Sequence, residues 1–260
     1  MSEDTDVVVL CLAFQNDIAN VYIRCGTKTR SRYIDIKKIA TSLGANICTG
    51  LIGLHSFTGC DTVSVFGGRG KLAGLKLISK EGPLQRAMIS LGQHWDLTPD
   101  LFIHLQEFTC KLYSPQSTTT QVNDLRYQLF RLKKGDIESG QLPPCEDALY
   151  LHAKRANYQA AVWRRTMENH PHIPAPQGHG WSEEDGHVTL KWMEGSPAPD
   201  VVLELMACAC NKECKLPKCQ CLAYGIKCTP ACKLQMCDNM IDEEQCTLSD
   251  DIEDASSDTD

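Results

Sequence analysis

Cysteine is the residue type whose spacing in this sequence points most directly to chemistry. Eight of the fifteen cysteines lie within thirty residues, in the pattern C-x-C-x3-C-x4-C-x-C-x6-C-x3-C-x4-C: Cys208, Cys210, Cys214, Cys219, Cys221, Cys228, Cys232 and Cys237. Two thiols one residue apart do not easily form a disulfide with each other, but both can bind one metal ion. A tetrahedral zinc site takes four sulfur ligands, so the spacing predicts a small domain folded around structural zinc.

The rest of the chain must support this domain. With 260 residues, of which 42% are hydrophobic and 23% charged, it can bury one sizeable core and still carry a small second domain. The net charge is −7, but residues 238–260 hold ten acidic residues and no basic one, which leaves 26 basic and 23 acidic side chains elsewhere. The acidic total therefore comes from a tail that we predict to be disordered, and a nucleic-acid partner is not excluded.

The sequence carries no signal for a membrane or for secretion. No apolar run approaches the ~20 residues of a membrane span, and the N-terminus is acidic, unlike that of a secretion signal. We therefore expect an intracellular protein without a membrane partner. Cys246 is a tail thiol, and the other cysteines are expected to be reduced and buried: Cys11, Cys25, Cys48, Cys60, Cys110 and Cys145.

The N-terminal two thirds combine strand and helix signals. The continuous apolar run Val7–Phe14 is typical of a strand buried on both faces of a parallel sheet. Two short strands are predicted at 21–24 and 32–34, and Asp35 can cap a helix that stops at Gly44. Further helices are predicted at 49–57, 72–79, two within 83–113, 122–133 and 146–168. A hairpin is predicted around residues 184–193, followed by a short capped helix at 197–206.

Residues 58–71, TGCDTVSVFGGRGK, form the most informative turn of this part. An acid follows a Gly-Cys pair, and a glycine-rich loop then leads to a basic residue at the start of a helix. Backbone amides in such a loop can form a phosphate-binding concavity. It is not a Walker A loop, because its glycine spacing differs and Leu72 follows Lys71.

The segments SEDTDVVVL and FTGCDTVSVFGGRGKLAGLKLI resemble the PIN-like nucleases of the flap endonuclease type. This resemblance implies a parallel α/β sheet, carboxylates at Asp4, Asp6 and Asp61 that bind magnesium, and a clamp for the DNA backbone. The implied clamp residues are Gly68, Arg69, Gly70 and Lys71. Clustered carboxylates can hold two magnesium ions about 4 Å apart and promote phosphodiester hydrolysis. The alternative is that Asp4 is a solvated acid at a strand end and Asp61 caps the next helix.

The family also places a strand with an aspartate and a helix with paired glutamates before the strand expected at Val7, and neither occurs in this chain. The three aspartates alone would be short of ligands for two ions. We therefore expect an incomplete or degenerate nuclease body without strong activity of its own.

The middle region contains two features with competing interpretations. Residues 146–168 are rich in Arg and Lys, but a core helix with one solvated basic face is favoured over a DNA-binding helix. The histidines of NHPHIPAPQGHGWSEEDGH are irregularly spaced, which favours loop and turn roles over metal binding. The order of RANYQAAVWRR, GHGW and the cysteines resembles a set of transposon-associated animal proteins, which implies an origin in a mobile element.

The cysteine pattern resembles the CXC domain of tesmin-like proteins, in which nine cysteines bind three zinc ions and share some sulfurs. Eight positions match, while the ninth, two residues after Cys232, is Leu234. We therefore expect two or three zinc ions, either as a shared cluster with one ligand missing or as two separate tetrahedral ions. Structural zinc supplies ~10 kcal/mol or more of folding free energy, so the apo domain should be largely unfolded.

Tesmin-like domains bind double-stranded DNA, and the resemblance assigns contacts to Lys218, Tyr224 and Lys227. Residues 208–237 contain five lysines and one acid, a charge suited to phosphate contact. Lys218 stands where the family often has a tyrosine, which implies weaker or less specific binding. The alternative is a structural zinc knot or a protein-binding surface.

Together these patterns predict an α/β protein in four parts. Residues 1–112 form an incomplete PIN-like body, 113–200 a helical region with a Pro/Gly-rich loop and hairpin, 201–239 the CXC zinc domain and 240–260 the acidic tail. The expected function is zinc-dependent DNA binding by a nuclear protein derived from a mobile element. The main alternative is a magnesium-dependent nuclease completed by sequence upstream of this chain.

Overall fold

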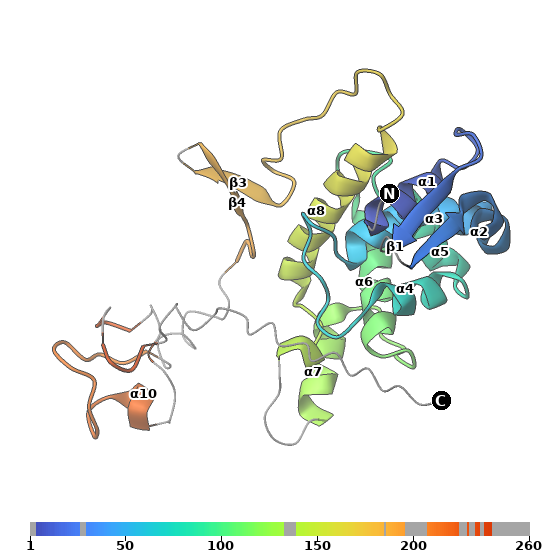
Figure 1. Cartoon of the computed structure of the whole chain (residues 1–260). Coiled ribbons are helices and arrows are strands. Elements are labelled where there is room, and N and C mark those ends of the chain that lie inside the picture. Colours follow the sequence, from blue (N-terminus) through green and yellow to red (C-terminus); the bar gives the residue numbers. More distant parts are fainter. Residues whose placement is uncertain are drawn as a thin grey trace. The chain divides into compact units, whose positions relative to one another are not determined.

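The computed structural model describes residues 4–26, 30–132, 139–184, 186–195, 207–223, 228, 232–234 and 237–240. The chain divides into two compact units, which we call the body (Met1–Gly195) and the cysteine-rich unit (Ser196–Asp260). The body is built mainly of helices, with two small antiparallel sheets (Figure 1). Within the described residues, no helix combines the length and the apolar character needed to cross a membrane.

Helix α3 (Ala45–Thr58) lies at the centre of the body. Most of its residues are small or apolar, and eleven of the fourteen are buried, as expected for a helix surrounded by protein. The helices that pack against it include α1 (Thr5–Ala13), α5 (Gly82–Ser90) and α8 (Glu146–Arg164). The closest approach occurs at Gly53, where a Cβ would lie 2.1 Å from the carbonyl oxygen of Met88 on α5. The core of the body is thus organised around one buried helix.

The other helices of the body agree with the ranges predicted from the sequence. They are α2 (Ile36–Leu43), α4 (Lys71–Ile78), α6 (Pro99–Tyr113) and α7 (Val122–Leu132). A short 3-10 turn, η1 (Ser139–Gln141), is an element that the sequence did not predict. The predicted cap of α2 is confirmed, because the Asp35 carboxylate accepts a hydrogen bond from the Lys38 backbone N–H at 3.0 Å. The same helix ends at Gly44, whose φ of 85° favours glycine.

The predicted strand at Val7–Phe14 is wrong, because this segment forms helix α1. A continuous apolar run has no period that separates a buried strand from a buried helix. The deciding residue is Asp4, whose carboxylate accepts the Asp6 backbone N–H at 3.0 Å and caps the helix. The helix buries Val9 and Leu12 and packs on α3.

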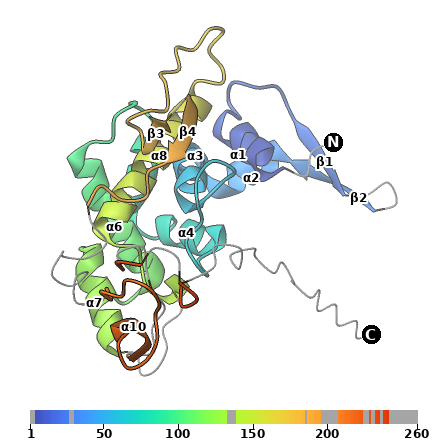
Figure 2. The same ribbon diagram turned by 90° about the vertical axis from the view of Figure 1, so that its left-hand side faces the viewer.

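The expected parallel sheet is not found among the described residues, whose two sheets are both antiparallel hairpins. β1 (Tyr22–Gly26) pairs with β2 (Ser31–Asp35) where two strands were predicted, and this hairpin projects from the helices beside α1 and α2 (Figure 2). β3 (Trp181–Glu184) pairs with β4 (His187–Leu190) in the predicted second hairpin. The described body is therefore helical with two hairpins, and the α/β fold class is corrected accordingly.

Polar side chains of α8 hold neighbouring segments of the body in place. Arg155 is buried, and its Nη1 donates to the carbonyl oxygens of Gly180 (3.0 Å) and Lys191 (2.8 Å), which fixes the β3–β4 hairpin on the helix. Arg164 donates to three carbonyl oxygens of residues 88–91 at the C-terminus of α5, where helical partners are missing. Both arginines act inside the body, which supports the core-helix interpretation of this segment.

The cysteine-rich unit has little regular secondary structure among its described residues. α10 (Gln220–Ala223) is a single turn, and a β-bridge links Cys228 to Met240. The buried core of the unit consists of cysteines: Cys208, Cys219, Cys221, Cys228 and Cys232. Bound metal is a common source of stability for small units that have thiols in place of an apolar core.

Candidate metal centre

Among the described residues, side chains able to bind a metal come together in three groups, and all three consist of cysteines. The sulfur atoms of each group lie within 4.8 Å of one another. The first group is Cys208, Cys210, Cys214 and Cys219; the second is Cys208, Cys221, Cys228 and Cys232; the third is Cys214, Cys228 and Cys237. All eight cysteines singled out in the sequence therefore belong to one cluster.

Each pair of groups has one sulfur in common. Cys208 belongs to the first and second groups, Cys214 to the first and third, and Cys228 to the second and third. These three shared sulfurs form a triangle with sides of 3.7, 3.7 and 3.9 Å. With Zn–S bonds of about 2.3 Å, two ligands of one tetrahedral zinc lie about 3.8 Å apart, so the spacing suits bridged zinc–thiolate coordination.

Backbone and side-chain N–H groups donate to sulfurs of the cluster. The Cys208 backbone N–H lies 3.4 Å from Cys232 Sγ, and Asn239 Nδ2 lies 3.3 Å from Cys228 Sγ. Such donors stabilise the negative charge of a metal-bound thiolate. The sequence alone does not identify Asn239 as part of the site. Its position two residues after Cys237, the last cysteine of the cluster, is the only feature of the sequence that points to it.

The local environment changes the pKa of individual thiols. A hydrogen bond from the Leu222 backbone lowers the pKa of Cys219 to about 7, which favours the thiolate that metals bind. Burial raises the pKa of Cys221 to about 11, so this thiol keeps its proton at neutral pH. It loses the proton only when a metal ion binds to the sulfur and displaces it. The cluster as a whole offers the donor type, spacing and burial that zinc or another thiophilic ion requires.

The DNA contacts assigned by resemblance are only partly within the described structure. Lys218 is exposed beside the buried Cys219. Tyr224 and Lys227 lie outside the described residues. The helix expected at 197–206 and the acidic tail expected from residue 240 onward also lie outside them, apart from Met240.

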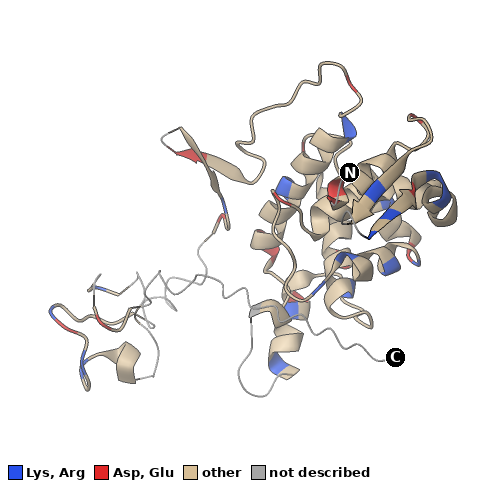
Figure 3. Cartoon of the chain, viewed as in Figure 1, with Lys and Arg blue, Asp and Glu red and all other residues tan. Residues whose placement is uncertain are grey.

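A basic cleft borders the cysteine cluster. It has a volume of about 740 Å³, is formed by residues 209–220, and is lined by Lys212, Lys215 and Lys218 together with Cys210. Lys215 pairs with Glu213 at 2.8 Å, but both side chains are mostly exposed, so this ion pair is weak. Figure 3 colours the described lysine and arginine residues of the chain blue, including those of the cysteine-rich unit.

The three aspartates assigned to magnesium lie in different settings. Asp4 caps α1, and Asp6 Oδ1 lies 2.5 Å from Nε2 of His55, a buried residue of α3. Asp61 is exposed in a tight turn formed by residues 60–63. None of them belongs to a metal-binding group within the described residues. Their catalytic role stays a prediction, while Asp4 caps α1 and Asp6 links α1 to α3.

The glycine-rich loop assigned to DNA backbone contact leads into α4. Lys71 Nζ donates at 2.6 Å to the carbonyl oxygen of Gly59, which ties the loop to the preceding turn. The Arg69 guanidinium lies 4.9 Å from the ring centroid of Tyr113, a cation–π contact. The φ of Gly68 is 64°, and Gly70 is the residue before the helix: both are exposed. Both basic side chains already have partners in the body, and their DNA contact stays a prediction.

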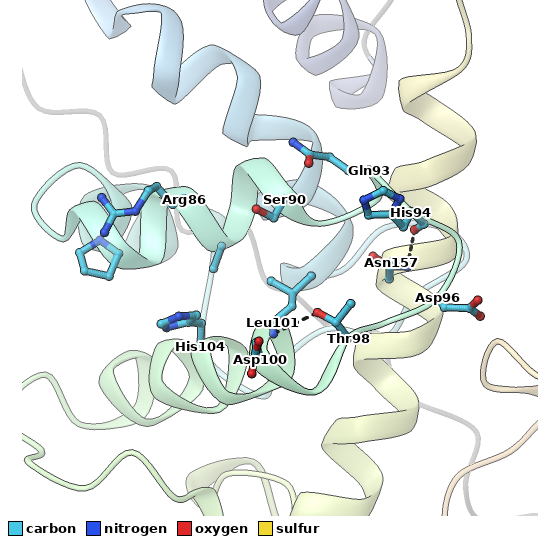
Figure 4. A pocket seen from close by; sticks show the side chains of 12 residues that line it. Arg86, Ser90, Gln93, His94, Asp96, Thr98, Asp100, Leu101, His104 and Asn157 are labelled. Atoms are coloured by element: carbon cyan, nitrogen blue, oxygen red, sulfur yellow. Dashed lines mark hydrogen bonds between the residues drawn. The ribbon is translucent and has the colours of Figure 1, made fainter.

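A second cleft, of about 450 Å³, lies in the body between α5, α6 and α8 (Figure 4). Asn157 shapes one wall, because its Nδ2 donates to the carbonyl oxygens of His94 (2.9 Å) and Trp95 (2.8 Å). Another wall begins at Thr98, which caps α6. The cleft mixes acidic and basic side chains, and none of the residues assigned a function from the sequence lines it.

Comparison of the chain with protein-family models, curated proteins and solved structures finds no match. The geometry therefore defines a class of site, a thiolate cluster able to bind zinc and consistent with a CXC-like domain. The resemblances to PIN-like nucleases and to transposon-associated proteins rest on sequence motifs alone.

Proposed function

We propose that the cysteine-rich unit is a zinc-dependent module of the tesmin-like CXC class that binds double-stranded DNA. The observation that carries this proposal is the basic cleft formed between cluster ligands. Lys212 lies between Cys210 and Cys214, while Lys215 and Lys218 lie between Cys214 and Cys219. All three lysines are thus on short segments whose two ends are metal ligands of the first group.

Metal binding positions these lysines. Because the core of the unit consists of thiols, the segments between them keep their arrangement only when the cysteines are held by metal. Phosphate oxygens of DNA attract clustered lysines, and neutralising phosphates releases counterions, which makes the affinity depend on salt. Zinc binding and DNA binding should therefore be lost together.

The mobile-element origin, the nuclear location and the nuclease-type body are further proposals. They rest on the sequence resemblances given above, and Asp61→Ala tests the last of them through magnesium-dependent cleavage of flap or duplex DNA. Equal cleavage by this variant and the unaltered chain would remove Asp61 from the site.

DNA binding is tested with the full chain by fluorescence anisotropy on a labelled duplex at low salt. We expect the variant carrying Lys212→Gln, Lys215→Gln and Lys218→Gln to bind about tenfold or more weakly. Its salt dependence should also fall, by about 0.9 in the log–log slope for each phosphate that a lysine no longer neutralises. A chelator that removes zinc should abolish the binding.

A matched control removes three exposed lysines of the body: Lys37→Gln, Lys38→Gln and Lys76→Gln. This control variant should bind DNA as the unaltered chain does. If the cleft variant keeps full affinity, the unit is a structural zinc knot or a protein-binding surface instead. If the control loses as much affinity as the cleft variant, binding reflects net charge and not the cleft.

A further inference from the structure

The three sulfur groups differ in how completely they can surround a metal ion. The first and second groups have four sulfurs each and together use seven of the eight cysteines, with Cys208 as their one shared ligand. Two tetrahedral ions are therefore fully satisfied without Cys237. The third group has three sulfurs, and two of them, Cys214 and Cys228, already serve the other groups.

We propose that the third group is an exchangeable metal position with one coordination site open to an external thiol. The proposal depends on metal loading of the cluster but not on DNA binding. Among the described residues, Cys237 would be the only unshared ligand of a zinc ion held there. A bridging thiolate divides its charge between two ions, so each of its bonds is weaker than that of an unshared thiolate. The third ion should accordingly be bound least tightly.

The burial of the sulfurs distinguishes the third group from the second. All four cysteines of the second group are buried, whereas Cys214 and Cys237 in the third group are only partly buried. Solvent and small ligands therefore have access to the third position. An external thiol matches the sulfur donors already present and would complete the tetrahedral set of four.

Leu234 identifies where the missing protein ligand could be restored. In the pairs Cys208–Cys210 and Cys219–Cys221, one residue separates the two cysteines. In the second pair, Cys219 belongs to the first sulfur group and Cys221 to the second. Leu234 has the same spacing from Cys232, is partly buried, and carries no donor atom in its side chain. A cysteine at this position would extend the pattern and supply a fourth thiolate.

Metal stoichiometry and affinity provide the first test. The zinc-loaded full chain is titrated with a chromogenic chelator in anaerobic buffer, and native mass spectrometry counts the ions that remain. We expect one ion to be released at about tenfold or more lower chelator concentration than the other two. Cys237→Ser should retain two ions, and Leu234→Cys should bind the third ion about tenfold or more tightly.

Cobalt provides a readout of the open position. The d–d spectrum of Co²⁺ in the third position should change when 2-mercaptoethanol is added to the unaltered chain. The spectrum of Leu234→Cys, in which the position is closed, should not change. Three ions of equal affinity, loss of more than one ion in Cys237→Ser, or an unaltered chain that does not respond to the thiol would each overturn the proposal.

Cys246 needs its own control, because it lies nine residues after Cys237 and outside the described residues. Cys246→Ser should leave the affinity of the third ion and the spectral response to the thiol unchanged. If this variant instead loses the third ion, Cys246 is the fourth ligand, the position is closed, and the proposal is overturned.

Discussion

At the scale of single residues, His152 shows how the body holds a titratable side chain neutral. Its Nε2–H donates to the carbonyl oxygen of Phe57 at 2.8 Å, and its Nδ1 accepts from the Ser64 hydroxyl at 3.2 Å. Burial lowers its pKa to about 4 from the usual value of 6.5. The ring is fully satisfied as a neutral group, so protonation would place an uncompensated charge among Phe57, Phe66 and the core.

Acidification is expected to destabilise the body through this histidine. Because its pKa is lower in the folded chain than in the unfolded chain, its stabilising contribution is complete above about pH 6.5. The contribution is then lost as the pH falls towards 4, by about 3 kcal/mol in total. Urea unfolding followed by tryptophan fluorescence between pH 7 and pH 4.5 measures this loss. His152→Gln, which keeps a donor for Phe57, should show a shallower pH dependence, and an unchanged dependence would rule out His152 as its cause.

The cysteines illustrate what single residues reveal in a sequence. Thiol spacing identified all eight members of the cluster, because a metal site requires a particular donor type in large number. Buried polar residues of the body gave no such signal. In the sequence, Arg155 and Arg164 are indistinguishable from arginines on a solvated basic face of a helix. Their hydrogen bonds to backbone carbonyl oxygens in the fold show that they are structural.

At the scale of elements, two glycines of α3 face α5, but the close contact between the two helices requires glycine at only one of these positions. A Cβ at Gly53 would lie 2.1 Å from the Met88 carbonyl oxygen, whereas a Cβ at Gly50 would meet its nearest neighbours at 3.6 Å or more. The first distance requires the helices to separate. The second is an ordinary van der Waals contact.

Alanine at these two positions should therefore have opposite effects. Gly53→Ala is expected to destabilise the body by about 1–3 kcal/mol, because the overlap with the backbone of α5 cannot be relieved by a side-chain rotation. Gly50→Ala should be neutral or stabilise by up to about 1 kcal/mol, since alanine favours the helix and finds room. Urea unfolding of both variants gives the comparison, and equal destabilisation by the two would contradict the close α3–α5 packing.

The elements that could be predicted were those with a local signal of their own. Asp35 and Gly44 mark both ends of α2 by capping chemistry, and the helical spacing of apolar residues placed α5, α6 and α7. The secondary structure predicted for the α1 segment is wrong, because its apolar run suits a strand or a helix equally. The nearby aspartates, Asp4 and Asp6, also suit a metal site. The cap formed by Asp4 was present in the sequence but was interpreted as catalytic chemistry.

At the scale of the whole molecule, the two units draw stability from different sources. The body has an apolar core that includes none of the clustered cysteines, and the core of the cysteine-rich unit consists of thiols. Spacing in the sequence identified the candidate metal ligands, but only the fold shows that Cys208, Cys214 and Cys228 each belong to two groups. Neighbours in the chain, such as Cys219 and Cys221, belong to different groups, so chain order does not reveal the partition.

Removal of metal is therefore expected to unfold the cysteine-rich unit and leave the body intact. All four tryptophans lie in the body, at positions 95, 163, 181 and 192, so their fluorescence reports on that unit alone. Excess chelator should leave the thermal midpoint seen by fluorescence unchanged, while trypsin should cleave rapidly at Lys212, Lys215, Lys218 and Lys233. The zinc-loaded chain, digested under the same conditions, is the control. A chelator-induced fall in the midpoint of the body would mean that its stability depends on the metal-bound unit.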